Sequence, residues 1–300
     1  MTNQQRHALS RVFGGLTGAA AAVIVLGLGV VLFDAVSGGW GVLSWRFFTE
    51  GPGEDFTQGG IFPAIYGTAV LTLLMTAAVM PFGVATAVYL HEYASPESRL
   101  ARLVRSAIHN LAGVPSIVFG LFGLGFFVNA VGGSLDAATG GGMKYGQPGL
   151  LWASLTLAVL TLPVVIVATE EALRAVPQEL RLASLALGAT RAQTLTRVTL
   201  PGALPGILTG AVLAISRGAG EVAPVLLTGV AFYLPELPGS LSSQFMHLGY
   251  HTYVLATQAP DVDAARPMLY GTVLVLLALT FLLNLLAMLV RAQARRTQLS

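Results

Sequence analysis

Residues 150–169 are LLWASLTLAVLTLPVVIVAT, a run of 20 residues that carries no charged side chain. A helix needs about 20 apolar residues to cross the hydrocarbon core of a bilayer, which is about 30 Å thick. This run therefore predicts a membrane-spanning helix. It also decides the fold class, because the chain repeats runs of this kind along its whole length.

Five further runs bring the expected number of spans to six. We predict the other spans at Val12–Phe33, Ala64–Leu90, Ile108–Val131, Leu204–Val230 and Met268–Val290. The composition agrees, because apolar residues make up 54% of the chain and charged residues only 10%, whereas a soluble domain has about 25% charged residues. We therefore expect an all-α polytopic membrane protein with six transmembrane helices.

We expect three parts along the chain. Residues 1–63 hold the first span and an outer loop, residues 64–290 form a transmembrane domain with a cytoplasmic loop at about 170–203, and residues 291–300 form a cytoplasmic tail. The first span could be mistaken for a signal peptide, because Arg6 and Arg11 precede it. Its 22 uncharged residues exceed the usual apolar part of a signal and no clear cleavage site follows, so we interpret it as a retained span.

The basic residues are sorted by side of the membrane. With a cytoplasmic N-terminus, 12 of the 16 lysines and arginines fall inside and three outside, and Arg217 falls within a span. The inside set is Arg6, Arg11, Arg99, Arg102, Arg105, Arg174, Arg181, Arg191, Arg197, Arg291, Arg295 and Arg296, and the outside set is Arg46, Lys144 and Arg266. The positive-inside rule therefore predicts that both termini are cytoplasmic.

Composition also excludes several classes of function. The chain has no cysteine, which excludes disulfides, thiol catalysis and cysteine-ligated metal centres. Its basic residues form no dense run or patch interleaved with aromatic residues, so we expect no nucleic-acid partner. The loops are too short to hold a soluble ATPase domain. We therefore expect no catalytic site and no cofactor in this chain, and any ATP hydrolysis would belong to a partner.

Two histidines, His247 and His251, have an i, i+4 spacing that could bind a metal ion. No nearby glutamate completes a zincin motif. We interpret them as a solvated or interfacial pair in an outer loop and expect no metal site.

The cytoplasmic loop between the fourth and fifth spans predicts two short helices. Pro177 suits the first position of a helix, and Gly188 suits the left-handed conformation that ends one. Thr190 and Gln193 have the spacing of a capping box that starts a second helix, and Pro201 marks the exit toward the membrane. From these features alone, the loop is equally well explained as an amphipathic hairpin on the lipid surface.

The same loop resembles the signature loop of ABC importer permeases. That pattern is Glu-Ala-Ala, three residues, Gly, nine residues, Ile, one residue and Leu-Pro, and every spacing is matched. The matching residues are Leu182, Ala183, Ser184, Gly188, Val198, Leu200 and Pro201, with Leu182 in place of the usual Glu. The resemblance implies that this helix docks into a cleft of a separate ATPase subunit.

A second informative stretch lies deep in the fifth predicted span, where Arg217 and Glu221 are spaced i, i+4 and could pair. Gly218 and Gly220 would allow another backbone to approach closely, and Pro224 predicts a helix break near the path. Charges at this depth usually face a partner or a water-filled route. The pair is either a structural clasp or a conduit in which Arg217 contacts a passing oxyanion.

Residues 216–224 also resemble the Arg-x-Ala-Gly-Glu-Thr-Ala-Pro stretch of phosphate ABC permeases of the PstA type, with Val222 in place of Thr. Residues 59–68 and 113–120 agree with that family as well. The resemblance implies the type I ABC importer permease fold, also called MetI-like, in a bacterial plasma membrane. It further implies a homologous PstC-type permease, two PstB-type ATPases that bind ATP and Mg²⁺, and an extracytoplasmic phosphate-binding protein.

The function implied is the import of inorganic phosphate. Two alternatives stay open: an ABC permease for another oxyanion such as sulfate or molybdate, and a membrane transporter or sensor that works without ATP.

Overall fold

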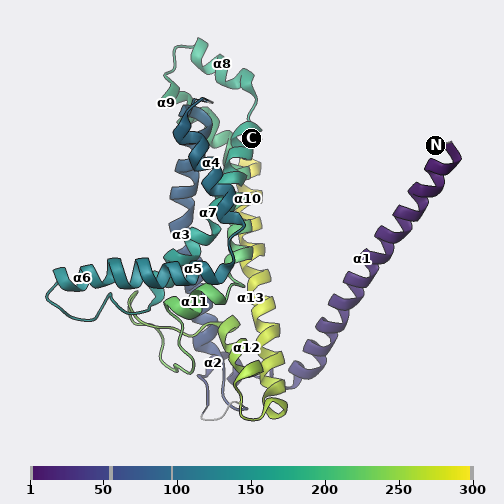
Figure 1. The fold of residues 1–300 in the computed structure, drawn as a ribbon, viewed down its shortest axis with the longest axis vertical. Coiled ribbons are helices and arrows are strands. Elements are labelled where there is room, and N and C mark those ends of the chain that lie inside the picture. The colour runs from purple at the N-terminus through teal and green to yellow at the C-terminus, as the bar shows by residue number, and fades with distance from the viewer. Residues whose placement is uncertain (1–2, 54–56, 96, 298–300) are drawn as a thin grey trace.

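The computed structural model describes residues 3–53, 57–95 and 97–297. Every regular element in these residues is a helix (Figure 1), apart from isolated bridges between Pro52 and Gly59 and between Val230 and Phe245. The α-helices are α1 Asn3–Gly39, α2 Trp45–Thr49, α3 Phe62–Val88, α4 Arg99–Ala112, α5 Ser116–Phe122, α6 Gly133–Ala138, α7 Leu150–Arg174, α8 Gln178–Ala186, α9 Arg191–Thr194, α10 Leu200–Gly218, α11 Ala223–Thr228, α12 Leu248–Thr257 and α13 Val262–Thr297. The other helical segments are the 3₁₀ helix η1 Trp40–Val42 and the π-helical segments η2 Tyr89–Tyr93, η3 Gly123–Gly132 and η4 Leu195–Thr199.

Six helical segments within the described residues are long and apolar enough to cross a membrane. They are Arg11–Val42, Phe62–Tyr93, Ser116–Ala138, Leu150–Arg174, Arg191–Gly218 and Val262–Ala294. The predicted number of spans is therefore confirmed. The first residues of α1, the last turn of α13 and helices α8 and α9 all lie at one end of the molecule (Figure 1).

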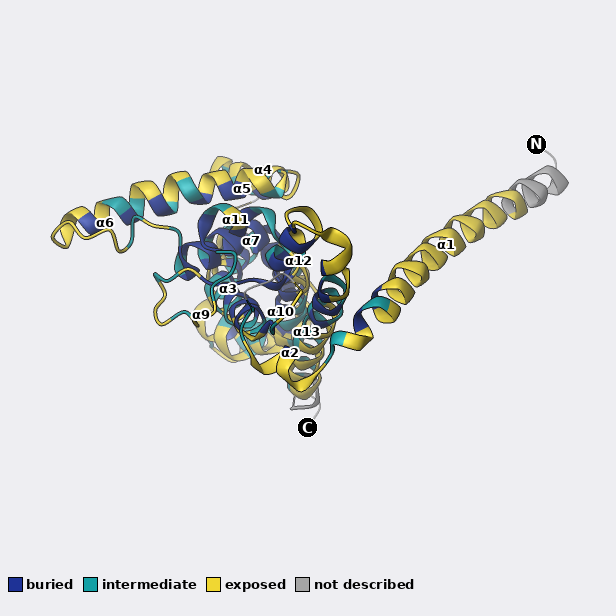
Figure 2. Ribbon diagram, turned by 90° about the horizontal axis from the view of Figure 1, so that it is seen from below, coloured by how far each residue is buried: buried dark blue, intermediate teal, exposed yellow. Residues whose placement is uncertain are grey.

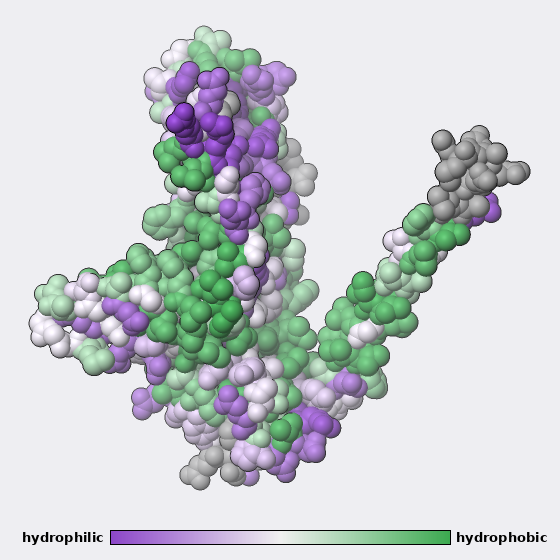
Figure 3. All heavy atoms as spheres, in the orientation of Figure 1, coloured by the Kyte–Doolittle hydropathy of each residue, from purple (hydrophilic) through white to green (hydrophobic). Residues whose placement is uncertain are grey.

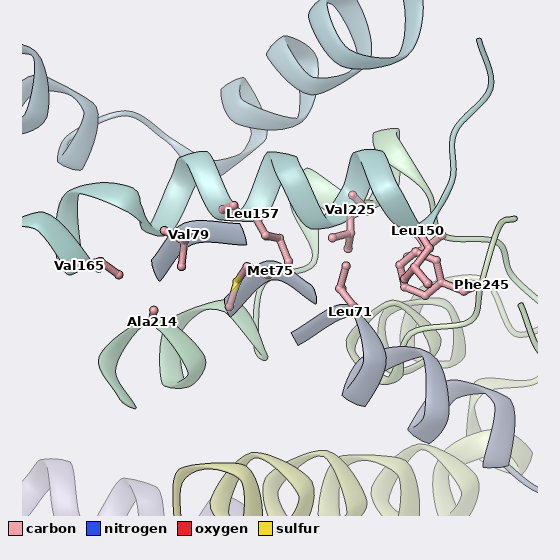
Figure 4. Packing of buried hydrophobic residues seen from close by; sticks show 12 residues of the cluster. Leu71, Met75, Val79, Leu150, Leu157, Val165, Ala214, Val225 and Phe245 are labelled. Atoms are coloured by element: carbon pink, nitrogen blue, oxygen red, sulfur yellow. The ribbon is translucent and has the colours of Figure 1, made fainter. Parts of the chain in front are cut away.

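Helix α7 is the centre of the bundle, because about two thirds of its apolar window is buried. Leu71, Met75 and Val79 of α3 pack against Leu157 and Val165 of α7 in the main core (Figure 4). Glycines let α10 approach α7 from another side: a β-carbon added at Gly206 would lie 2.4 Å from the Ala172 side chain, and one at Gly210 would lie 3.2 Å from Ala168. Small residues at such crossings allow close backbone packing.

A second core closes the opposite end of the bundle. Phe47 of α2, Met246, Leu248 of α12 and Met268 of α13 are buried together there. A hydrogen bond from the Leu248 amide to the Thr68 hydroxyl, 2.9 Å long, ties the start of α12 to α3. This core anchors the loops that follow α11.

Two apolar helical arms leave the bundle. Helix α1 diverges from it along most of its length, and its apolar window is 0% buried (Figures 1 and 2). It is held at its base, where Gly38 and Gly39 lie against Tyr270 and Gly271 of α13. The second arm continues from α5, which packs on the bundle, through η3 to α6, and apolar surface covers much of both arms (Figure 3). Such surface must be covered by lipid or by another protein.

The predicted boundaries of two spans are wrong. The third span was expected to begin at Ile108, but residues 108–112 belong to the separate helix α4, and the span begins at Ser116. Pro115 caps that span, and the residue before a proline is biased away from helical conformation. The fifth span was expected to continue to Val230, but α10 ends at Gly218 and α11 begins at Ala223. The expected tail at 291–300 is also largely helical, because α13 continues to Thr297, beyond which the residues lie outside the described chain.

Candidate functional site

The interruption between α10 and α11 is the first candidate site. Arg217 lies in the last turn of α10, and the Glu221 amide donates a 3.3 Å hydrogen bond to the Gly218 carbonyl in the turn that follows. The Arg217 Nε atom lies 3.8 Å from Glu221 Oε1. The two side chains are 39% and 21% exposed in the single chain. The predicted pair is therefore formed, but across a helix break and not along a continuous helix.

Gly218 and Gly220, expected to act together, have different surroundings. A β-carbon on Gly218 would lie 2.2 Å from the sulfur of Met75 on α3, so this position allows the end of α10 to press onto α3. A β-carbon on Gly220 would meet nothing within 4 Å. Gly220 therefore borders open space at the break.

Pro224 is buried in the first turn of α11 and follows the break. Its missing amide donor is tolerated there, because the first amides of a helix have no partner within the helix. A β-carbon on Gly120 would lie 3.0 Å from Pro224 Cα, so α11 packs closely on α5. The helix break that was predicted near Pro224 thus lies at residues 219–222, just before this proline.

Asn284 is a residue of this region that the sequence analysis missed. It lies on α13, and the Ser216 hydroxyl lies 2.7 Å from its Oδ1 atom. The available signal was a polar residue within the apolar run Met268–Val290, because polar groups inside a span mark contacts or pathways. The hydrogen bond fixes the last turn of α10 against α13, one residue before Arg217.

Helices α8 and α9 form the second candidate site, and their local geometry follows the sequence. Gly188 has φ +87°, in the left-handed region. Thr190 and Gln193 make both hydrogen bonds of a capping box at the start of α9. One detail differs: Pro177 is the N-cap of α8 and not its first helical residue.

Most residues of helix α8 are exposed, and none of its side chains is fully buried. Leu182 is 57% exposed and Leu187 is 89% exposed. Ser184 does not face outward in the same way, because its hydroxyl lies 3.0 Å from that of Thr194 and braces α8 against α9. Apolar side chains so exposed outside the membrane spans are typical of a surface that a protein partner covers.

The chain continues from this loop into the bundle at Leu200 and Pro201, the first two residues of α10. Leu200 packs beside the buried cluster of Ala172, Leu173 and Ala203. The loop is therefore connected directly to the helix that carries Arg217.

The interpretation of His247 and His251 as a solvated or interfacial pair is wrong. Their residues are 1% and 6% exposed. His247 accepts the Tyr250 amide at the start of α12, and His251 stacks on Phe232 with ring centroids 6.0 Å apart. Burial lowers the pKa of each imidazole to about 4. Among the described residues, no group of three or more His, Cys, Asp or Glu side chains could hold a metal ion.

Comparison with known proteins gives consistent results. The sequence profile of the family described as "binding-protein-dependent transport system inner membrane component" matches residues 79–297. Phosphate transport system permease protein PstA 1 of Mycobacterium tuberculosis (strain ATCC 25618 / H37Rv) is 34% identical over 267 residues, which cover 88% of this chain and 79% of that protein. The probable ABC transporter permease protein YqgI of Bacillus subtilis (strain 168) is 35% identical over 215 residues, covering 71% and 67% of the two chains.

Solved structures show the same fold. A chain of a bacterial alginate ABC transporter, in complex with its alginate-bound periplasmic protein, superposes with a TM-score of 0.64 at 17% identity over 94% of this chain and 93% of that chain. A chain of the inward-facing MetNI methionine ABC transporter superposes with a TM-score of 0.59 at 21% identity, covering 77% and 94% of the two chains.

Proposed function

This chain belongs to the family of binding-protein-dependent transport system inner membrane components, and we propose that the solute it carries into the cell is inorganic phosphate. It is a multi-pass inner-membrane permease subunit of an ABC importer and is not itself an enzyme.

The observation that carries the proposal is an arginine in the last turn of α10, beside a helix break and partly exposed in the single chain. A guanidinium group can donate two hydrogen bonds to one oxyanion, a geometry that suits phosphate. Arg217 and Glu221 lie beside Gly220, whose missing side chain leaves space at the break. The name of the mycobacterial relative, a phosphate transport system permease, agrees with this assignment.

We assign different tasks to the two charges. Arg217 contacts the anion in transit, and Glu221 competes for the same guanidinium. At 3.8 Å the pair is close but is not a tight bidentate contact, so a phosphate group can exchange with the carboxylate. Competition of this kind keeps the site from holding the ion too tightly to release it. The alternative, in which the two charges only neutralise each other as a clasp, is tested below.

The exposed face of α8 is the proposed contact with the ATPase subunit. Leu182, Ala183 and Gly188 would enter a cleft of that subunit, as an amphipathic helix enters a groove. ATP and Mg²⁺ would be bound by two PstB-type ATPases, and movement of α8 would pass through Leu200 and Pro201 into α10. The cytoplasmic location of this loop and of both termini is part of the proposal.

A homologous PstC-type permease would complete the path, and a phosphate-binding protein would deliver the ion outside. The two apolar arms, α1 and α5–α6, are the surfaces that a second permease and the surrounding lipid would cover.

The test is uptake of labelled phosphate in a strain that lacks its own phosphate permease, with labelled sulfate and molybdate as controls. We expect phosphate uptake alone to be restored when the chain is produced with its partner subunits. Restoration of sulfate or molybdate uptake without phosphate uptake would reject the assignment of the solute, and failure to co-purify an ATPase would reject the proposed contact.

A further inference from the structure

Arg181 differs from the other side chains of α8 because it points back toward the membrane domain. Its Nη1 atom donates a 2.6 Å hydrogen bond to Glu92 Oε1, and its Nη2 atom donates to the carbonyl of Leu173. Glu92 lies in η2, at the end of the span that contains α3, and Leu173 lies near the end of α7. One guanidinium group therefore joins α8 to the ends of two spans.

The partners of Arg181 are well shielded. The side chains of Arg181 and Glu92 are 19% and 22% exposed. Both line a cavity of about 530 Å³ that lies between α8 and the ends of the spans. An ion pair in such a place is screened less by salt than a surface pair and has charge-assisted hydrogen bonds. Since α8 has no buried side chain, these polar contacts carry much of its attachment to the spans.

The anchor itself is fixed by a second set of contacts. Arg105 on α4 donates a 2.8 Å hydrogen bond to the Leu90 carbonyl, within η2, and lies 3.3 Å from Glu170 on α7. Helix α4 thus holds η2 and α7 together through contacts that do not involve α8. The turn η2 is of the π type, and insertions of this type re-aim side chains and are frequent at functional sites.

We propose that Arg181 is a positioning residue that transmits the movement of α8 to the spans containing α3 and α7, with Glu92 as its anchor. This inference rests on the proposed contact between α8 and an ATPase. When that contact shifts α8, a charged link that is short and shielded pulls the ends of both spans with it. Without the link, α8 can follow the ATPase while the spans stay in place.

The first experiment compares Arg181→Gln, Arg181→Lys and Glu92→Gln in the assembled transporter, reconstituted in proteoliposomes with its binding protein. The quantity measured is ATP hydrolysed per solute imported. Loss of a coupling contact typically changes a linked equilibrium by about fivefold or more, so we expect that ratio to rise about fivefold in Arg181→Gln and Glu92→Gln. Arg181→Lys keeps the charge but not both hydrogen bonds, so its ratio of ATP hydrolysed to solute imported should lie between those of Arg181→Gln and wild type.

The matched control is Asp263→Asn, which removes the carboxylate from an exposed ion pair with Arg266, 2.8 Å long, at the other end of the molecule. We expect its ratio to equal that of wild type. The exchanged pair, Glu92→Arg with Arg181→Glu, restores the ion pair but not the bond to Leu173 and should recover part of the coupling.

The second experiment needs no transported solute. The chain has no cysteine, so nitroxide labels can be placed on Glu179→Cys in α8 and Ala77→Cys in α3, both of them exposed positions. We expect a single narrow distance distribution in the assembled transporter and a broader one when Arg181→Gln is added. A wild-type ratio together with an unchanged distribution in Arg181→Gln would overturn the proposal. If the phosphate assignment alone is wrong, wild type and Asp263→Asn will both fail to import phosphate, while the distance measurement will still respond to Arg181→Gln.

Discussion

The Nε atom of Arg217 and the Oε1 atom of Glu221 lie 3.8 Å apart across the break between α10 and α11. In a continuous helix this spacing would be a routine side-by-side pair. Here Arg217 belongs to a helix end and Glu221 to an irregular turn, so movement of either helix changes the distance between the charges. In the proposed transport cycle, the distance within this pair would therefore report movement of α10 relative to α11.

The double change Arg217→Ala with Glu221→Ala separates the clasp from the conduit. A clasp leaves no unpaired charge after both are removed, so abundance and transport would both be normal. A conduit loses the group that contacts the anion, and we expect an abundant protein without uptake. The measurement is labelled phosphate uptake normalised to membrane abundance by immunoblot, and uptake near that of wild type would reject the conduit.

Arg217→Lys tests the two-pronged geometry of the guanidinium group. The charge is kept, but one ammonium group cannot donate two parallel hydrogen bonds to a single oxyanion. We expect uptake to fall about tenfold, equivalent to about 1.4 kcal/mol, with little change in abundance. Glu221→Gln is the companion variant. It removes the carboxylate that competes with phosphate for the Arg217 guanidinium, so phosphate should be retained longer and the turnover of transport should fall. If Arg217→Lys imports phosphate at the normal rate, the bidentate contact is not used.

Gly188→Leu tests the turn that follows α8. A β-carbon there would meet no neighbour within 4 Å, so the expected defect comes from the backbone angle of φ +87° and not from a collision. The left-handed conformation costs a residue other than glycine about 1–2 kcal/mol, which would re-aim α8. We expect transport and stimulated ATP hydrolysis to be lost while the protein stays in the membrane.

Two controls accompany Gly188→Leu. Asparagine tolerates the left-handed conformation better than most residues, so Gly188→Asn should keep a substantial part of the activity. Leu182→Glu restores the residue that the importer pattern prefers and should be tolerated. Normal coupling in Gly188→Leu would show that this turn does not position the docking helix.

Reporter fusions test the orientation. Fusions after Gly53 or near Ser240 should report the outside, and fusions within the loop at about 170–203 should report the cytoplasm, because the basic residues are concentrated on that side. An inside signal at Gly53 or Ser240 would contradict the proposed topology.

The buried histidines predict a loss of stability in acid. Each imidazole has its pKa lowered to about 4 by burial, so between pH 6.5 and 4 the unfolded chain binds protons that the folded chain does not. The free energy of unfolding is therefore highest above pH 6.5 and falls as the pH drops toward 4. With about 1.4 kcal/mol per pKa unit, the loss is about 3 kcal/mol for each histidine.

The measurement is the midpoint of thermal unfolding in detergent at pH 7 and pH 4.5. In the control, His247→Asn keeps a side-chain acceptor at the helix cap and His251→Phe keeps a ring against Phe232, while neither new side chain titrates. The double variant should show a smaller fall in midpoint than wild type. Equal falls in both proteins would mean that these histidines do not govern the acid sensitivity.

The fold could be predicted from the sequence because membrane spans can be recognised from the length and apolar composition of a run of residues alone. The capping box at Thr190 and the left-handed conformation of Gly188 could be predicted equally well, because each depends only on residues a few positions apart. The exact helix ends at 113–115 and 219–222 could not be predicted, although Pro115 and Pro224 lie beside them, because the apolar runs continue on both sides of each break. Their positions depend on contacts such as Gly218 on Met75 and Gly120 on Pro224, which join distant parts of the chain.

The same limit applies to the sites. Arg217 and Glu221 could be found because charges within an apolar run stand out. Arg181 and Glu92 are 89 positions apart, and each looks like an ordinary cytoplasmic charge in the sequence. The burial of His247 and His251 was missed for a related reason: their loop is polar in part, and only the packing of α12 onto α3 and α13 encloses it.

The divergent α1 has a consequence for how the protein is made. About two thirds of the apolar window of α7 is buried within the chain, but α1 buries none of its apolar window against its own fold. Its final location is therefore decided after synthesis, by whatever neighbour it meets in the plane of the membrane. In a copy without its partners this helix would be covered by lipid alone, so assembly would replace contacts with lipid by contacts with protein along its length.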